Sequence, residues 1–234
     1  MSFITLDFET YYSDTVGFKK MTTEEYVRNR KFHVIGVGVR VDDAPAVWFS
    51  GSHEETKSFL MQFDWDESAL LCHNMLFDGS VLAWKFGIKP AFYYDTLCMA
   101  RAIHGVEAGG SLKALAERYE LGTKGTEVDD AKGKKREDFT PEDLAQYGEY
   151  CKNDVELTYK LYHEMSSFPT IEKRLIDITI RMFSDPLLEL DVDKLEDHLK
   201  GVRERKEKLF VEAGQRDNTD SDPYVETTPE NVLE

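Results

Sequence analysis

Two acidic residues interrupt an apolar run at the start of the chain, and this pattern constrains the fold more than any other. Residues 3–10 read Phe-Ile-Thr-Leu-Asp-Phe-Glu-Thr, which is typical of a buried β-strand. Because side chains alternate between the faces of a strand, Asp7 and Glu9 project from the same face. Two like charges on a buried strand are costly unless they are protonated or bind a cation. An edge strand with a solvent-facing acidic side has the same pattern, so a metal site requires further carboxylates.

The net charge limits which partners the chain can bind, and by what means. Lys and Arg number 29 against 45 Asp and Glu, a net charge of −16 over 234 residues. No overall basic field therefore draws the chain to nucleic acid or anionic membranes, which counts against a simple DNA-binding module. An enzyme that meets phosphates through bound divalent cations is still allowed. There is no apolar run of the roughly 20 residues that span a membrane, so we expect no membrane partner.

The termini and the cysteines indicate the compartment. The N-terminus lacks the basic and apolar segments of a signal peptide. The three cysteines are far apart and form no Cys-x-x-Cys motif. We expect free thiols and a cytoplasmic location, in a bacterium or in a phage-infected host.

Strand and helix patterns predict a mixed α/β domain over residues 1–168. The strands expected at 3–10, 33–41 and 46–50 have short connections, which favours an antiparallel meander. Alternating strands and helices follow, through a helix expected from 140 to 165. The other expected elements are strands at 69–73 and 93–94 and helices at 22–30, 52–63, 75–86, 96–103 and 112–120.

A second, helical portion is expected at residues 169–234. Amphipathic helices are predicted at 171–183 and 193–211, and the acidic tail ends without a closing element. We therefore expect a flexible tail and the start of a longer portion. Between the helices of the first domain, the charged segment 123–138 lacks periodicity and predicts a mobile loop. Its basic cluster indicates either a solvated loop or a contact to substrate phosphates: Lys132, Lys134, Lys135 and Arg136.

Further carboxylates come from two other places. The sequence Asn74-Met-Leu-Phe-Asp78 runs from a strand end into the first turn of a helix, where an acid is also favoured by the helix dipole. The sequence Tyr150-Cys-Lys-Asn-Asp154 places a tyrosine and an acid on one helix face, although a half-buried tyrosine beside a surface acid would look the same. Together with Asp7 and Glu9, these acids form a set of oxygen ligands suited to hard divalent cations.

The ordered set of three motifs resembles the DnaQ-like 3′–5′ proofreading exonucleases of the DEDD group. The motifs begin at Asp7, Asn74 and Tyr150, and the resemblance covers about residues 1–168. It implies a ribonuclease H-like fold with a five-stranded mixed sheet flanked by helices, followed here by a C-terminal helical segment. The tyrosine four residues before Asp154 resembles the tyrosine branch, because the histidine branch would carry histidine where this chain has Glu149.

Two further stretches look like an exonuclease domain of a family A DNA polymerase, bacterial or phage. The first combines Asp95-Thr with Ser111-Leu-Lys-Ala-Leu-Ala. The second is Pro186-Leu-Leu-Glu-Leu-Asp-Val-Asp193 with the charged helix after it, which is similar to the entry into a polymerase portion. The resemblance thus implies a single-stranded or frayed DNA 3′ end as substrate and a covalent or associated polymerase portion as partner.

The resemblance also implies a role for each acid and for the tyrosine. Asp7 would bridge two divalent cations, Mg²⁺ or Mn²⁺, and Glu9 and Asp154 would complete the ligands on the nucleophile side. Asp78 would hold the cation on the leaving-group side. Tyr150 would orient the attacking water, as expected for two-metal phosphodiester hydrolysis.

Several neighbouring residues fit more than one role in the resemblance. Phe77 fits either the substrate groove or the core. His73 is a possible metal ligand, but a neutral histidine at a strand end is favoured because the four-acid set is complete. Asp95 fits either an acid behind the ligands or a helix cap. The positions that match the groove for the 3′-terminal nucleotides are Phe8, Thr10, Asn74 and Phe77.

Three competing functions stay open at this stage. An RNA 3′ exonuclease of the same fold would carry the same motifs, since the distinction depends on how the 2′-hydroxyl is accommodated. A non-catalytic scaffold that binds nucleic acid or a partner should lack one or more of the acids, and all four are present. A glycosidase with two carboxylates would leave the second acid pair and Tyr150 unexplained.

Overall fold

The computed structural model describes residues 2–123, 125 and 131–213, and a five-stranded mixed sheet lies at its centre. The strand order is β3-β2-β1-β4-β5. β1 pairs antiparallel with β2 and β2 with β3, whereas β1 pairs parallel with β4 and β4 with β5. The antiparallel meander and the mixed sheet are therefore confirmed. The bounds are β1 Ser2–Thr10, β2 Val34–Val41, β3 Val47–Phe49, β4 Ser68–Cys72 and β5 Phe92–Asp95.

The helices begin where capping residues predict them. Thr22, Ser52 and Thr140 each cap a helix, and an acid three residues later completes a capping box in each case. The described α-helices are α1 Thr23–Arg28, α2 His53–Leu60, α3 Met75–Phe86, α4 Thr96–His104, α5 Leu112–Arg118, α6 Pro141–Glu164, α7 Thr170–Ser184 and α8 Val192–Glu212. Short 3₁₀ turns lie at Val106–Ala108 and Arg136–Asp138.

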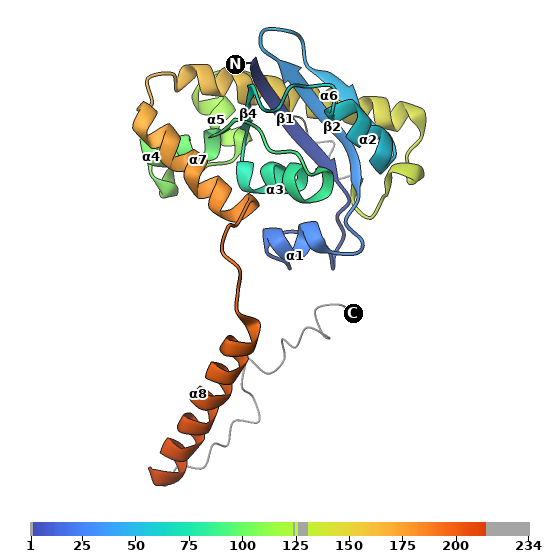
Figure 1. Ribbon diagram of the computed structural model, residues 1–234. Helices are drawn as coiled ribbons and strands as arrows, with labels where there is room; N and C mark the ends of the chain where they lie inside the picture. The colour runs from blue at the N-terminus through green and yellow to red at the C-terminus, as the bar shows by residue number, and fades with distance from the viewer. Residues whose placement is uncertain (1, 124, 126–130, 214–234) are drawn as a thin grey trace. The chain divides into compact units, whose positions relative to one another are not determined.

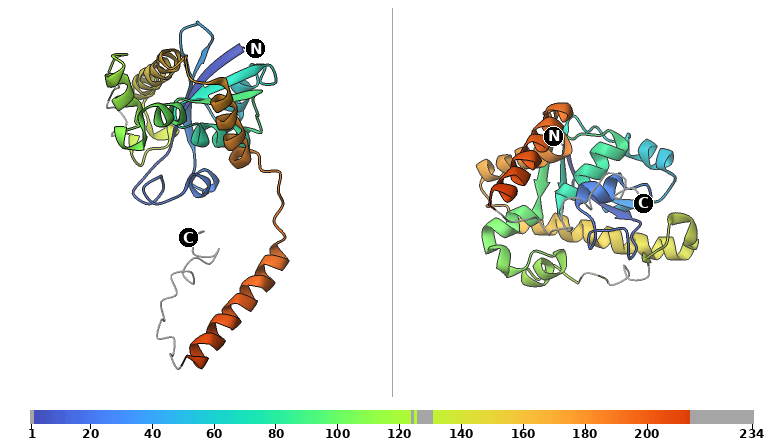
Figure 2. Two further views of the ribbon diagram at one scale, coloured as in Figure 1. Left: turned by 90° about the vertical axis from the view of Figure 1, so that its left-hand side faces the viewer. Right: turned by 90° about the horizontal axis from the view of Figure 1, so that it is seen from below.

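Helices cover both faces of the sheet (Figure 1). The view from below in Figure 2 shows α6 along one face and α3 with α7 on the other. Alternate residues of β1 point to these two layers. Ile4, Leu6 and Phe8 are buried in the main core with residues of α3. The residues that alternate with them along the strand, which include Asp7 and Glu9, therefore face α6. This alternation directs the acids out of the main core.

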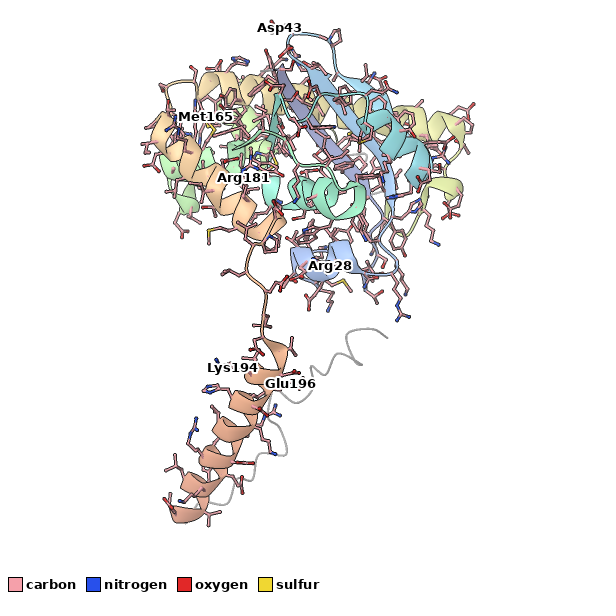
Figure 3. All side chains as sticks on the ribbon, in the orientation of Figure 1. Arg28, Asp43, Met165, Arg181, Lys194 and Glu196 are labelled. Atoms are coloured by element: carbon pink, nitrogen blue, oxygen red, sulfur yellow. The ribbon has the colours of Figure 1, made fainter. Side chains whose placement is uncertain are left out.

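α7 is part of the first compact unit, which ends at Asp185. The buried Asp177 accepts a hydrogen bond from the Tyr93 N–H of β5 at 2.9 Å. Arg181, labelled in Figure 3, donates to the carbonyl oxygens of Pro90 and Ala91 at 3.1 and 2.8 Å. We expected α7 in the second portion, because Pro169 opens a new amphipathic helix. By its contacts, α7 instead belongs with the sheet.

The second compact unit begins at Pro186 and contains α8. Asp191 caps this helix by accepting the Lys194 N–H at 3.1 Å, and the predicted charged helix is confirmed. The tail at 214–234 and positions 124 and 126–130 of the expected loop lie outside the described residues. Among the helices that the structure describes, none is long and apolar enough to cross a membrane.

Candidate active site

The two acids of β1 lie opposite two glycines of β2. Asp7 pairs with Gly38 and Glu9 with Gly36 in the antiparallel register. Directly paired residues share a sheet face, so the face that carries the acids has no β2 side chain beside either one. Sequence patterns did not single out these glycines. The available signal was the Gly-x-Gly spacing inside a strand, which has the same period as the Asp-x-Glu of β1.

The absent side chains let α6 approach the sheet closely. A Cβ at Gly38 would lie 2.8 Å from Cys151 Sγ and 3.0 Å from Val155 Cγ2. At Gly36 a Cβ would overlap the ring of Trp48, and at Gly148 of α6 it would lie 2.5 Å from the same ring. Only glycine fits at these positions without movement of the helix or of Trp48. The close packing sets the distance between the acids of β1 and the side chains of α6.

α6 carries the third motif, Tyr150 and Asp154. Tyr150 and Asp154 lie one helical turn apart and are both buried. Burial raises the pKa of Tyr150 first, and the negative charges of Asp154, Glu9 and Asp7 and a hydrogen bond to Asp154 raise it further. The Tyr150 hydroxyl therefore keeps its proton and stays available as a hydrogen-bond donor.

A second pair on α6, Tyr147 and Cys151, contacts the acids of β1 directly. The Tyr147 hydroxyl donates to Glu9 Oε2 at 2.6 Å. Cys151 Sγ lies 3.4 Å from the carbonyl oxygen and 3.6 Å from Oδ2 of Asp7. Ligand atoms of Asp7, Glu9 and Cys151 all lie within 4.8 Å of one another, close enough to surround one cation. Sequence patterns missed both contacts, although residue 147 shares a helix face with Tyr150 and Asp154.

Asp78 enters the site from the first turn of α3. Its side chain is buried, and Oδ1 accepts the backbone N–H of Phe8 at 3.0 Å. Burial raises the pKa of Asp78 well above its usual 3.8, the charge of Asp7 raises it further, and the hydrogen bond from Phe8 opposes the rise. The hydrogen bond from the Phe8 N–H, next to Asp7, shows that the first and second motifs meet. The three motifs therefore converge at one end of β1.

Asn74 lies at the N-terminus of α3 in a left-handed conformation with φ of 72°. Its N–H donates to Oδ1 of the buried Asp95 at 3.0 Å, and the same oxygen accepts the Leu97 N–H at 2.8 Å. Asp95 is thus the cap of α4 that we predicted as one alternative, and it also supports the strained start of α3. His73 turns elsewhere, since its ring nitrogens contact Thr96 Oγ1 at 2.8 Å and the Gly110 oxygen at 2.9 Å.

The other expected groove residues occupy different surroundings. The side chain of Phe8 stacks on Phe86 at a centroid distance of 5.7 Å, inside the main core. Phe8 therefore brings only its backbone to the site, because it alternates with the acids along β1. Phe77 stacks on Tyr26 at 5.9 Å, and Thr10 Oγ1 is hydrogen-bonded to the Tyr26 hydroxyl at 2.8 Å. Both thus border the end of β1 that carries the site.

Described residues of the basic cluster contact other parts of the protein. Lys132 Nζ pairs with Asp14 at 2.5 Å, and Arg136 Nε donates to Ser50 Oγ at 3.2 Å. These contacts fit a loop that packs on the domain surface. A contact to substrate phosphates stays a prediction.

A mixed sheet that gathers four carboxylates and a tyrosine from β1, α3 and α6 defines a nuclease-type site. Comparison with known proteins agrees with this class. The family model described as a 3′–5′ exonuclease matches residues 3–168, and the chain belongs to this family. No curated protein sequence matches the chain.

Solved structures share the fold at low identity. Brucella melitensis NrnC bound to pGG is 15% identical, with a TM-score of 0.56 over 79% of this chain and 82% of that one. Trypanosoma brucei RNase D in complex with RNA U12 is 16% identical, with a TM-score of 0.57 over 80% and 65% of the two chains. The family B DNA polymerase of Pyrobaculum calidifontis is 14% identical, with a TM-score of 0.54 over 78% and 27%. The expected ribonuclease H-like fold is confirmed.

Replacement of Gly38 by alanine tests the close approach of α6. We expect the added Cβ to push Cys151 and α6 away from β1, which lowers the free energy of unfolding by about 1–3 kcal/mol and slows nuclease turnover roughly ten- to a hundred-fold. Urea denaturation and cleavage of an end-labelled oligonucleotide measure the two effects. The double variant G38A/C151A removes the nearest clash and should recover part of both, whereas unchanged stability and activity in G38A would refute the packing argument.

Replacement of Asp78 by asparagine tests the raised pKa of this carboxyl. The folded, metal-free protein holds the Asp78 proton to a higher pH than the unfolded chain, so this contribution to stability is complete in acid and is lost as the pH rises through the folded pKa. D78N cannot ionise and keeps an oxygen for the Phe8 N–H. In EDTA at pH 8 we expect it to be more stable than the wild type by about 1 kcal/mol or more, with a smaller difference near pH 4.

Thermal denaturation with and without Mg²⁺ provides the control for D78N. A cation that binds only the folded wild-type site should stabilise that protein and leave D78N unchanged. Equal stability of the two metal-free proteins at pH 8 would contradict the assignment of a raised pKa to Asp78.

Proposed function

We propose that this chain hydrolyses phosphodiester bonds at DNA 3′ ends and releases nucleoside 5′-monophosphates. The observation that carries the proposal is the convergence of the acids of β1, α3 and α6 around Tyr150, within a chain of the 3′–5′ exonuclease family. Each acid lies on the element that its motif requires. A scaffold without catalysis would have no need to keep four partly buried carboxylates together.

The proposed cofactors are two divalent cations, Mg²⁺ or Mn²⁺. The donor set fits them, because carboxylate oxygens are the preferred ligands of hard cations and carboxylate oxygens of Asp7 and Glu9 lie within 4.8 Å of each other. Asp7 would contact both cations, Glu9 and Asp154 the one beside the attacking water, and Asp78 the one beside the leaving oxygen. When bound, such cations activate water and neutralise phosphate charge. A solved structure of NrnC contains Mg²⁺.

The residues of this chain perform the remaining tasks of the reaction. Tyr150 stays protonated, because burial and the nearby carboxylates raise its pKa, so its hydroxyl can hold the attacking water by donating or accepting a hydrogen bond. The Phe8 N–H fixes Asp78 through its hydrogen bond. Glycines 36 and 38 keep α6 close enough for these groups to act together.

DNA is the proposed substrate, and RNA is the alternative that the comparisons keep open. Structures of NrnC with pGG and of RNase D with RNA share the fold, as does a family B DNA polymerase. The polymerase-like stretch 186–193 favours DNA. Discrimination would depend on room for a 2′-hydroxyl beside the terminal sugar.

Digestion of a 5′-labelled DNA oligonucleotide with Mg²⁺ or Mn²⁺ tests the proposal. We expect a ladder that shortens from the 3′ end and disappears with EDTA or in Asp7→Ala, because both changes remove the cations. A matched RNA oligonucleotide should be cut at least about ten-fold more slowly if the site excludes the 2′-hydroxyl. Faster cleavage of RNA would assign the alternative substrate. No cleavage of either by the folded protein would overturn the nuclease proposal.

A polymerase portion, covalent or associated, is the proposed partner in the cytoplasm of a bacterium or phage-infected host. Exposed apolar side chains on α7 and α8 support such a partner, because large apolar surfaces are usually covered. On α7 they follow heptad spacing at Ile171, Leu175, Ile178 and Met182, and on α8 they include Val192, Leu195, Leu199 and Leu209. The cysteines that the structure describes are free thiols, which supports a reducing compartment.

The net charge of the chain predicts weak DNA binding in the absence of this partner. At a net charge of −16, the chain alone should bind single-stranded DNA weakly without metal, with a Kd above about 10⁻⁵ M, because its net negative charge repels the phosphates. Filter binding at moderate salt in EDTA measures this affinity. Tight metal-free binding would show that the chain needs no other portion to hold DNA.

A further inference from the structure

A second tyrosine, besides Tyr150, donates a hydrogen bond to one of the acids of the site. The Tyr147 hydroxyl of α6 donates to Glu9 Oε2 at 2.6 Å, a short bond to a half-buried carboxylate. Tyr147 itself is buried. It lies one turn before Cys151 and three residues before Tyr150, so α6 carries two interleaved pairs on the face toward β1.

Packing holds the Tyr147 ring in place from several sides. It stacks on Phe139 at a centroid distance of 5.6 Å and on Tyr150 at 6.2 Å, and it meets the Trp48 ring edge-on at 6.2 Å. Trp48 in turn occupies the space that Gly36 and Gly148 leave open. A ring enclosed in this way delivers its hydroxyl to one point.

The bond to Glu9 is a bond from a neutral donor. A phenolic hydroxyl is uncharged and donates one hydrogen bond, and here the acceptor is Glu9 Oε2. Its proton points at Oε2, so the hydrogen bond limits how the Glu9 carboxylate can turn. A donor that fixes one oxygen of a ligating carboxylate orients the other and reduces the entropy lost when a cation binds.

We propose that Tyr147 is a positioning residue that holds the Glu9 carboxylate in the orientation in which it binds a divalent cation. The inference rests on the proposed function, since Glu9 acts there as a metal ligand. It adds to that function a determinant of metal affinity which lies outside the four acids and Tyr150. Tyr147 touches neither substrate nor cation in this role and acts only through Glu9.

The test compares Tyr147→Phe with a matched control on the same helix. Tyr159 also donates its hydroxyl to a carboxylate at 2.6 Å, but its partner is Asp43 in the turn between β2 and β3. Figure 3 shows Asp43 at the opposite end of the first unit from Arg28 of α1, and α1 lies beside Thr10 at the site end of β1. Each variant loses one hydroxyl and keeps its ring, so both are expected to fold.

Binding of Mn²⁺ to the protein without nucleic acid is the primary readout, by calorimetry or by the electron paramagnetic resonance of free Mn²⁺. Removal of a donor to a metal ligand typically weakens metal affinity about ten-fold or more, so we expect this loss in Y147F and no loss in Y159F. Thermal denaturation in EDTA checks that both variants are folded. Equal Mn²⁺ affinity of Y147F and the wild type would overturn the inference.

A double-variant cycle separates positioning from a general structural effect. In a Glu9→Ala background there is no carboxylate to orient, so Tyr147→Phe should weaken Mn²⁺ binding no further. The same loss in both backgrounds would show that Tyr147 acts on the fold and not through Glu9. Failure of the proposed function has a different signature, namely Mn²⁺ affinity in the wild type that does not depend on Asp7 or Glu9.

Discussion

Mutual repulsion of carboxylates in a partly buried place is the constraint on which the rest of the structure depends. Burial raises the pKa of Asp78, and the charge of Asp7, from a different segment of the chain, raises it further. Two uncharged hydrogen-bond donors offset this repulsion: the Phe8 N–H, which bonds to Asp78, and the Tyr147 hydroxyl, which bonds to Glu9. These donors stabilise the acids without neutralising them, so the site keeps its attraction for cations.

The fold and most of the site could be predicted because their signals are local. Capping boxes locate helix starts, and the apolar run around Asp7 identifies the central strand. Each of the three motifs places an acid on a strand or helix that its own local sequence predicts, so their order along the chain predicted which side chains would meet. Two of the expected groove residues, Phe8 and Phe77, have their rings in the main core, and for Phe8 the alternation of its own strand explains this position.

What the sequence did not reveal depends on contacts between distant segments. The glycines of β2 matter only because α6 packs over them, and Tyr147 matters only because its hydroxyl reaches Glu9 of β1. Tyrosine is common in this chain, so its position carried no signal without the register of α6 on the sheet. The docking of α7 likewise depends on Asp177 accepting a bond from β5, which no pattern within α7 could indicate.

α6 is one continuous helix from Pro141 to Glu164. Natural or engineered changes must therefore preserve the rotational phase of the helix, which is the angular position of its side chains around the helix axis. Each residue turns a helix by about 100°, so loss of one residue between Tyr147 and Asp154 would carry half of the site to another side of the helix. Residues added before Thr140 leave the phase untouched, because the cap restarts the helix there. We therefore expect insertions and deletions to be tolerated upstream of the Thr140 cap but not between Tyr147 and Asp154.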